Sequence, residues 1–203
     1  MSLVSAAILL FLVMDPFGNA PTFLLLLKRV PLKKRQKVII RELLIALAVL
    51  IFFLFSGPWV LQALHISEPS LRIAGGIILF LVALRMVFGN IEIFPSGAPD
   101  DEPYIVPLAI PLIAGPSAIA MVMLLTGQEP GRWLAWLTSL LLAWGATSAI
   151  LLLSSHLDRF LGPKGMNALQ HLMGLILTAI AVEMFMQGLF SAMATGLTPA
   201  MHP

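Results

Sequence analysis

Asp15 is the carboxylate whose place in the sequence is hardest to explain by packing alone. With Pro16, Gly18 and Asn19 it interrupts an apolar run that otherwise extends from position 3 to position 27. A carboxylate, a carboxamide and helix breakers are costly inside hydrocarbon, and where they occur they usually contact a ligand, an ion or a proton. The sequence therefore predicts a functional site centred on Asp15.

The length of the segment before Asp15 predicts its depth. The residues from Leu3 to Met14 form a helix of about 18 Å, so Asp15 is expected near the middle of a hydrocarbon layer of about 30 Å. A helix that starts there, at Pro16, presents unpaired N–H groups and a positive dipole end to an anion. A helix that ends there presents unpaired carbonyls to an ammonium group or a small cation. A small zwitterion fits this pair of helix ends.

The composition allows one class of protein. Of the 203 residues 59% are hydrophobic and 11% are charged, and the mean hydropathy is +0.98, which excludes an ordinary soluble domain. The chain is expected to be an all-α polytopic membrane protein whose first segment is not a cleaved signal. It contains no cysteine, so disulfides and thiolate metal sites are excluded, and neither a cofactor, a metal nor a nucleic-acid partner is expected. The lipid bilayer is its expected surrounding.

Six apolar segments are expected to cross the membrane, at about 3–28, 39–64, 70–89, 104–126, 133–155 and 167–192. We expect one transmembrane domain over residues 1–203, with a first half at about 1–90, a cytoplasmic loop at about 90–103 and a second half at about 104–195. The glycine- and proline-rich stretch 162–165 is expected to be a turn. Lysines and arginines gather in the first loop: Lys28, Arg29, Lys33, Lys34, Arg35, Lys37 and Arg41. This excess predicts a cytoplasmic first loop and both termini outside.

The two halves resemble each other. The stretch that begins at Gly76 aligns with the stretch that begins at Gly174, and Asp15-Pro16 aligns with Gly115-Pro116. Pro107 and Pro111 also kink the fourth segment. Three spans in each half force opposite orientations, so the sequence predicts two inverted three-helix repeats with helices 1 and 4 broken near the midplane, and a site between the breaks.

The residues expected to bind substrate all lie at one of the two breaks: Asp15, Pro16, Gly18, Asn19, Thr22, Gly115, Pro116 and Ser117. Asp15 and Glu183 are the candidate coupling residues, because a carboxylate inside the membrane can carry a proton. Plainer interpretations stay open. Asp15 is also suited to cap a helix that starts at a proline. Asn19 could be a cap, Ser117 could bond its own backbone, and Glu183 could be a carboxylate at the membrane rim.

Several motifs resemble the MarC family of bacterial inner-membrane proteins, and most closely its YhgN-type subgroup. They are Asp-Pro-Phe-Gly-Asn-Ala-Pro-Thr-Phe at 15–23, Arg-Glu-Leu-Leu-Ile-Ala-Leu at 41–47, Gly-Gly-Ile-Ile-Leu-Phe-Leu at 75–81, Val-Pro-Leu-Ala-Ile-Pro-Leu-Ile-Ala-Gly-Pro at 106–116 and His-Leu-Met-Gly-Leu-Ile-Leu at 171–177. The resemblance covers nearly the whole chain. It implies six spans, a distant similarity to LysE-type exporters, and carriage of glycine- or alanine-like amino acids with a proton as the candidate coupling ion.

We therefore expect a secondary transporter whose partner is a small zwitterionic amino acid. The alternatives are an exporter of another small metabolite or a drug, and a membrane sensor that binds without transporting. An enzyme is not expected, because Asp15 is the one carboxylate placed centrally and the metalloprotease motif H-E-x-x-H is absent. Oligomeric state and the direction of transport are not encoded in these patterns.

Overall fold

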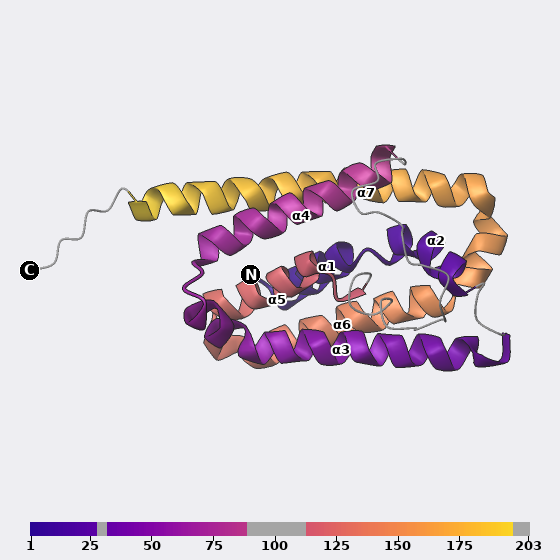
Figure 1. Cartoon of the computed structure of the whole chain (residues 1–203), viewed down its shortest axis with the longest axis horizontal. Helices are drawn as coiled ribbons and strands as arrows, with labels where there is room; N and C mark the ends of the chain where they lie inside the picture. Colours follow the sequence, from indigo (N-terminus) through magenta and orange to yellow (C-terminus); the bar gives the residue numbers. More distant parts are fainter. Residues whose placement is uncertain (28–31, 89–112, 197–203) are drawn as a thin grey trace, which may run out of the picture.

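A computed structural model describes residues 1–27, 32–88 and 113–196 as a bundle of helices (Figure 1). Within these ranges no β-strand occurs. The helices are α1 (Leu3–Met14), α2 (Pro16–Leu27), α3 (Leu32–Ala63), α4 (Glu68–Phe88), α5 (Pro116–Gln128), the 3₁₀ helix η2 (Pro130–Arg132), α6 (Trp133–Leu152) and α7 (Ser154–Gly196).

Five stretches of the described chain are long and apolar enough to cross a membrane. They are Leu3–Ala20, Gln36–Ala63, Glu68–Phe88, Pro130–Leu152 and Lys164–Ala194, and they match five of the six expected segments. The fourth expected segment is represented by α5, a shorter apolar helix that begins at Pro116. Its first half, with Pro107 and Pro111, lies outside the described residues. The all-helical class is thus confirmed.

Two helix boundaries differ from the expectation. α3 begins at Leu32, seven positions before the expected 39, because the lysines, arginine and glutamine that precede the apolar run are themselves good helix formers. The expected turn over 162–165 is found as a kink at Gly162, where two helical stretches of α7 meet. Only Gly162 leaves the helical region, with φ 64° and ψ 176°, and α7 changes direction there (Figure 1) and continues. Glycine adopts this left-handed φ without a steric penalty, whereas the residues around it remain helical.

α4 and α7 run antiparallel side by side, and glycines allow their close approach (Figure 1). A Cβ on Gly76 would lie 2.9 Å from the carbonyl oxygen of Ala181 and 2.9 Å from the amide nitrogen of Phe185. A Cβ on Gly174 would lie 2.9 Å from Cγ2 of Val87 and 3.2 Å from the carbonyl oxygen of Ala83. A larger residue at either glycine would therefore push the two helices apart.

The shorter helices lie against the longer ones. α2 contacts α6 and α7, whereas α5 contacts α1, α3 and α4, and α1 also packs on α6. Side chains connect the backbones at two of these interfaces. Ser139 donates a hydrogen bond to the carbonyl of Leu3 (2.9 Å), and the indole of Trp144 donates to the carbonyl of Leu43 (2.9 Å). These two hydrogen bonds link α1 and α3 to α6.

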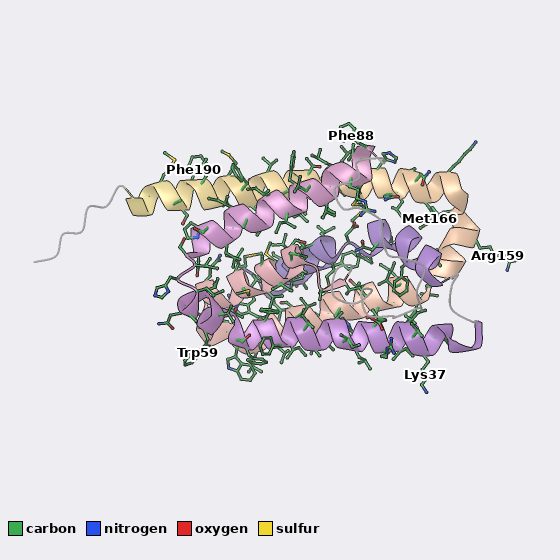
Figure 2. All side chains as sticks on the ribbon, in the orientation of Figure 1. Lys37, Trp59, Phe88, Arg159, Met166 and Phe190 are labelled. Atoms are coloured by element: carbon green, nitrogen blue, oxygen red, sulfur yellow. The ribbon has the colours of Figure 1, made fainter. Side chains whose placement is uncertain are left out.

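The surface of the bundle is suited to lipid (Figure 2). Trp59, Phe88 and Phe190 project outward and are 76%, 66% and 61% exposed, respectively. Exposed apolar area of this kind on every long helix is expected where acyl chains are the solvent. Lys37 and Arg159 lie toward the end of the bundle opposite to Trp59. We call the end that holds Met1, the 64–67 turn and η2 the Met1 end.

Candidate functional site

The first break lies where the sequence places it. α1 ends at Met14, and Asp15 has a left-handed backbone with φ 45° and ψ 62°. The amide of Asp15 donates to the carbonyls of Leu12 (3.1 Å) and Phe11 (3.2 Å), and α2 then begins at Pro16. The fixed φ of proline suits the first position of a helix, and aspartate tolerates the left-handed region better than most residues. One residue therefore ends one helix and starts the next.

The carboxylate of Asp15 is buried and only half satisfied. Its Oδ1 accepts a hydrogen bond from the amide of Gly18 (3.1 Å), which confirms that Asp15 caps α2. The residue is 3% exposed, and Oδ2 has no hydrogen-bond partner within the described chain. A buried carboxylate oxygen without a partner is unfavourable, so this atom is the place for a proton, a cation or a ligand donor.

Gly18 and Met86 close over this carboxylate. A Cβ at position 18 would collide with Oδ2 of Asp15 and with Cε of Met86, which reaches the break from α4. The absence of a side chain at Gly18 is thus what lets the thioether and the carboxylate come so close. Met86 is itself buried at 6% exposure. The sequence did not identify Met86, because only the fold brings it to Asp15.

The end of α1 is not open, contrary to the sequence interpretation. The carboxamide of Asn19 donates to the carbonyl of Met14 (3.0 Å), and the left-handed turn at Asp15 occupies the carbonyls of Leu12 and Phe11. A left-handed residue after a helix satisfies the last carbonyls in this way. The prediction of unpaired carbonyls at the end of α1 is therefore wrong for Phe11, Leu12 and Met14 in this conformation. Asn19 acts here as a cap for α1.

The second break has no comparable cap. Gly115 is extended, with φ −65° and ψ 165°, and Pro116 starts α5 without a hydrogen bond from any described side chain to the first turn. Gly115 is buried, Ser117 is 7% exposed, and Pro116 is exposed. An uncapped helix start offers its first N–H groups and its positive end to an anion. The two breaks thus differ, because one has a carboxylate cap and the other has none.

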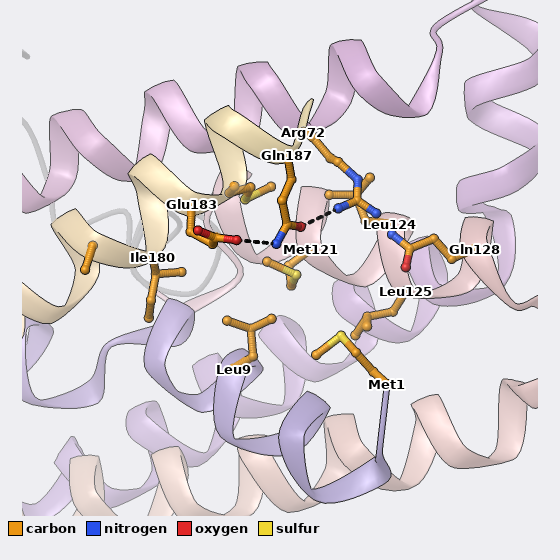
Figure 3. A pocket seen from close by; sticks show the side chains of 12 residues that line it. Met1, Leu9, Arg72, Met121, Leu124, Leu125, Gln128, Ile180, Glu183 and Gln187 are labelled. Atoms are coloured by element: carbon orange, nitrogen blue, oxygen red, sulfur yellow. Dashed lines mark hydrogen bonds between the residues drawn. The ribbon is translucent and has the colours of Figure 1, made fainter. Parts of the chain in front are cut away.

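A cavity of about 780 Å³ lies between α1, α4, α5 and α7 (Figure 3). It extends from Met1 and Gln128 at the Met1 end to Leu9, Met121 and Ile180. Leu9 precedes Asp15 by six residues and Met121 follows Ser117 by four, so the cavity ends about 9 Å and about 6 Å along the helices from the two breaks. It leads toward the breaks without reaching them.

Glu183 lies on a wall of this cavity, apart from the other predicted residues. Its Oε1 accepts a hydrogen bond from Nε2 of Gln187 (2.7 Å), and Oε1 of Gln187 accepts one from the guanidinium of Arg72 (2.8 Å; Figure 3). None of the eight residues predicted to bind substrate lines the cavity. Gln187 follows Glu183 by four positions, so their shared helix face could have been recognised from the sequence. The contribution of Arg72 needed the fold.

The structure therefore groups the predicted residues in three places. Asp15, Pro16, Gly18 and Asn19 form the first break, while Gly115, Pro116 and Ser117 form the second, on a helix that contacts α1. Thr22 lies in α2, but its side chain is outside the described part of the structure. Glu183 is in the cavity.

Comparison with known proteins places the chain in a family. The model of the MarC family, described as integral membrane proteins, matches residues 1–193. This chain belongs to the MarC family. It is 50% identical over 188 residues to the UPF0056 inner membrane protein YhgN of Escherichia coli K12, covering 92% of this chain and 95% of YhgN.

More distant relatives extend across bacteria and archaea. A UPF0056 membrane protein of Buchnera aphidicola subsp. Baizongia pistaciae is 45% identical over 192 residues, with 93% of this chain and 96% of that protein covered. One from Methanocaldococcus jannaschii is 38% identical over 193 residues, with 91% and 94% covered. No solved structure matches. The resemblance drawn from the motifs is confirmed, and the chain is an integral membrane protein.

Proposed function

We propose that this chain is a secondary transporter of small neutral amino acids, glycine- or alanine-like, in the bacterial inner membrane, with both termini outside. The observation that carries the proposal is the carboxylate of Asp15. It is buried at the chain break between the apolar helices α1 and α2, and its Oδ2 has no partner in the described structure. Such a group is costly unless it binds something during function, and a membrane helix is usually broken where a solute is bound.

The fold of the proposed transporter is a pair of inverted repeats that together make six spans. The support comes from two reciprocal contacts. In the internal alignment Gly76 corresponds to Gly174 and Ala83 to Ala181, and Gly76 approaches Ala181 as Gly174 approaches Ala83. The second half-helices are also exchanged between the repeats. α5 packs on α3 and α4 of the first half, whereas α2 packs on α6 and α7 of the second half.

The proposed substrate site lies between the two breaks. The carboxylate of an amino acid would bind at the uncapped start of α5, at Pro116 and Ser117. Its ammonium group would bind Oδ2 of Asp15, which otherwise holds the coupling proton. Asn19 now occupies the carbonyl of Met14, and Met86 covers Asp15, so both side chains must move before substrate enters. We therefore assign this conformation to a state in which Asn19 and Met86 close the first break to substrate.

Access from the Met1 end would be through the cavity between α1, α4, α5 and α7. Its deep wall is apolar at Leu9, Met121 and Ile180. A thin apolar barrier between a wet cavity and a midplane site is what alternating access requires on the closed side. Glu183, the second candidate for proton coupling, lies on the wet side of this barrier.

The test is flux in liposomes containing the purified chain, with a panel of radiolabelled amino acids, with and without a pH gradient. We expect uptake of glycine and alanine above that of protein-free liposomes, accelerated when the inside is acidic, because the amino acid replaces the proton on Oδ2 of Asp15 and the proton crosses in the opposite direction. Asp15→Asn liposomes serve as the matched control and are expected to remain at background. Equal, background-level flux for every amino acid would contradict the proposal. Saturable binding without any flux would favour a sensor that binds and does not transport.

A further inference from the structure

Arg72, Gln187 and Glu183 form a hydrogen-bonded row along one wall of the cavity (Figure 3). The row crosses from α4 to α7, and all three side chains line the cavity. Two charged groups of opposite sign are thus joined through a neutral carboxamide. Among the described residues, neither Arg72 nor Glu183 forms a salt bridge.

The carboxylate of Glu183 needs water or an opposite charge beside it. It belongs to the apolar span Lys164–Ala194 and its side chain is exposed. An ionised carboxylate is not tolerated against acyl chains, so it must face a hydrated cavity or an opposite charge. The cavity supplies the first of these. Arg72, half-buried four residues after the start of α4, faces the same space.

The carboxamide of Gln187 presents one hydrogen-bond acceptor and one donor to Arg72 and Glu183, in the same order as the carboxylate and the ammonium group of an amino acid would. Its carboxamide oxygen accepts a hydrogen bond from Arg72, as a carboxylate would, and its carboxamide nitrogen donates one to Glu183, as an ammonium group would. Arg72 uses one of its five N–H donors in this contact, and no other acceptor binds it in the described chain. Replacing a neutral acceptor by a carboxylate strengthens a guanidinium hydrogen bond and allows it to become bidentate.

We propose that Arg72 and Glu183 form an outer recognition site for α-amino acids, in which the amino acid displaces the carboxamide of Gln187. The carboxylate binds Arg72 and the ammonium group binds Glu183. This inference rests on the proposed function for its substrate class, but it concerns a site distinct from the two breaks. A cavity of about 780 Å³ is much larger than alanine, so selection here depends on the spacing of two charges and not on a close fit.

The test is binding of tritiated L-alanine to the full-length chain in detergent. Wild type should bind saturably, and Arg72→Gln and Glu183→Gln should each weaken binding roughly ten- to a hundredfold, the value of a hydrogen bond to a charged group. Gln187→Ala should tighten binding, because it removes the internal competitor. If the three side chains only stabilised the fold, all three variants would instead bind alanine more weakly than wild type. Arg85→Gln, which removes a charge at the far end of the same helix α4, is the matched control and should be unchanged.

Competition by unlabelled compounds tests the chemistry of recognition. Glycine and alanine should displace the label best, β-alanine less well and 4-aminobutyrate least, because the distance between their charges increases. Propionate and ethylamine, which carry one charge each, should compete poorly. Equal competition by propionate and alanine would contradict recognition of both charges.

Flux measurements separate this inference from the proposed function. If Arg72→Gln and Glu183→Gln bind alanine like wild type while wild-type liposomes still transport it, the outer site is wrong and transport stands. If alanine binding depends on Arg72 and Glu183 but neither wild type nor any variant transports alanine, the outer site is supported and the proposed transport is contradicted. Absence of alanine binding to wild type overturns the outer site. Monodispersity and thermal stability of each variant identify any that fail to fold, and then Arg72→Lys and Glu183→Asp replace them.

Discussion

Gly76 and Gly174 make the same contact from opposite sides of the α4–α7 interface. A Cβ on Gly76 would lie 2.9 Å from the carbonyl oxygen of Ala181, and a Cβ on Gly174 would lie 3.2 Å from that of Ala83. Helices that approach with backbone against backbone need small residues at the crossing, as is common in membranes. The two glycines therefore set the distance between α4 and α7.

Replacing these glycines should destabilise the protein unequally. The three atoms nearest to the methyl group that Gly76→Ala adds are backbone atoms, which cannot rotate away, so this change should cost about 1–3 kcal/mol. The atom nearest to the methyl group of Gly174→Ala is in the side chain of Val87, which can move, so that change should cost less. Thermal unfolding in detergent measures the difference. Gly145→Ala in α6 is the control, because nothing lies within 4 Å of its added methyl group. If Gly145→Ala lowered the thermal stability as much as Gly76→Ala, the close approach of α4 and α7 would not explain the destabilisation.

Substitutions of Asp15 should separate its charge from its cap. Asparagine keeps an oxygen for the Gly18 amide and tolerates the left-handed backbone, so Asp15→Asn should retain thermal stability and lose amino acid flux. Asp15→Ala loses the cap and strains the backbone, and should be less stable by about 1–3 kcal/mol. Thermal unfolding and liposome flux are measured on both. Wild-type flux in Asp15→Asn would remove the carboxylate from the mechanism.

A carboxylate at the Met1 end should give a measurable pH dependence. The hydrogen bond from Arg132 to Glu129 (2.9 Å) lowers the pKa of Glu129 below its ordinary value of 4.5, with a further contribution from the amino group of Met1. Because the folded pKa is lower than the unfolded one, the stability that this contact adds is present above about pH 4.5 and is lost as pH falls through the folded value.

The measurement is the melting temperature of the purified protein between pH 7 and pH 3. Arg132→Gln should lower the melting temperature at pH 7 and reduce its fall in acid, because the pKa of Glu129 then moves toward its ordinary value and only the Met1 amino group still lowers it. High salt should weaken the effect in wild type, since both side chains are exposed. An acid-induced fall of equal size in Arg132→Gln would assign the pH dependence to other groups.

The absence of cysteine allows a direct test of orientation. Ser67→Cys lies in the turn between α3 and α4 at the Met1 end, and Lys164→Cys lies at the opposite end, in α7. A membrane-impermeant maleimide should label the first in intact cells and the second only after the membrane is opened. The reverse pattern would place both termini in the cytoplasm and contradict the distribution of lysines and arginines.

The helices and the first break could be predicted from the sequence because both depend on local signals. Long apolar runs define the spans, and Asp15-Pro16 combines a good cap with a residue that starts helices. The same local reasoning located the kink at Gly162 but predicted a longer break than the structure has. There a single glycine absorbs the whole change of direction, and the residues around it stay helical. The inverted repeat, the sixth span and amino acid transport remain predictions.

What the sequence could not supply depends on contacts between distant residues. Met86 reaches Asp15 from another helix, and Arg72 meets Gln187 across 115 positions of sequence. Asn19 was correctly considered as a cap, but its acceptor, the carbonyl of Met14, became visible only when Asp15 proved to be left-handed. Hydropathy and motif spacing contain no information about such partners, because they follow from how the helices pack.

The two helix breaks differ in charge, since Asp15 caps one and Gly115 leaves the other bare. In the proposed cycle the amino acid is neutral overall, so the proton that returns on Asp15 in exchange for it is the net charge that crosses. Each turnover then moves one elementary charge through the membrane potential, which is worth about 2.3 kcal/mol at 100 mV and sustains roughly a 50-fold concentration ratio. Uptake should therefore generate an electric current, with one charge for every amino acid carried.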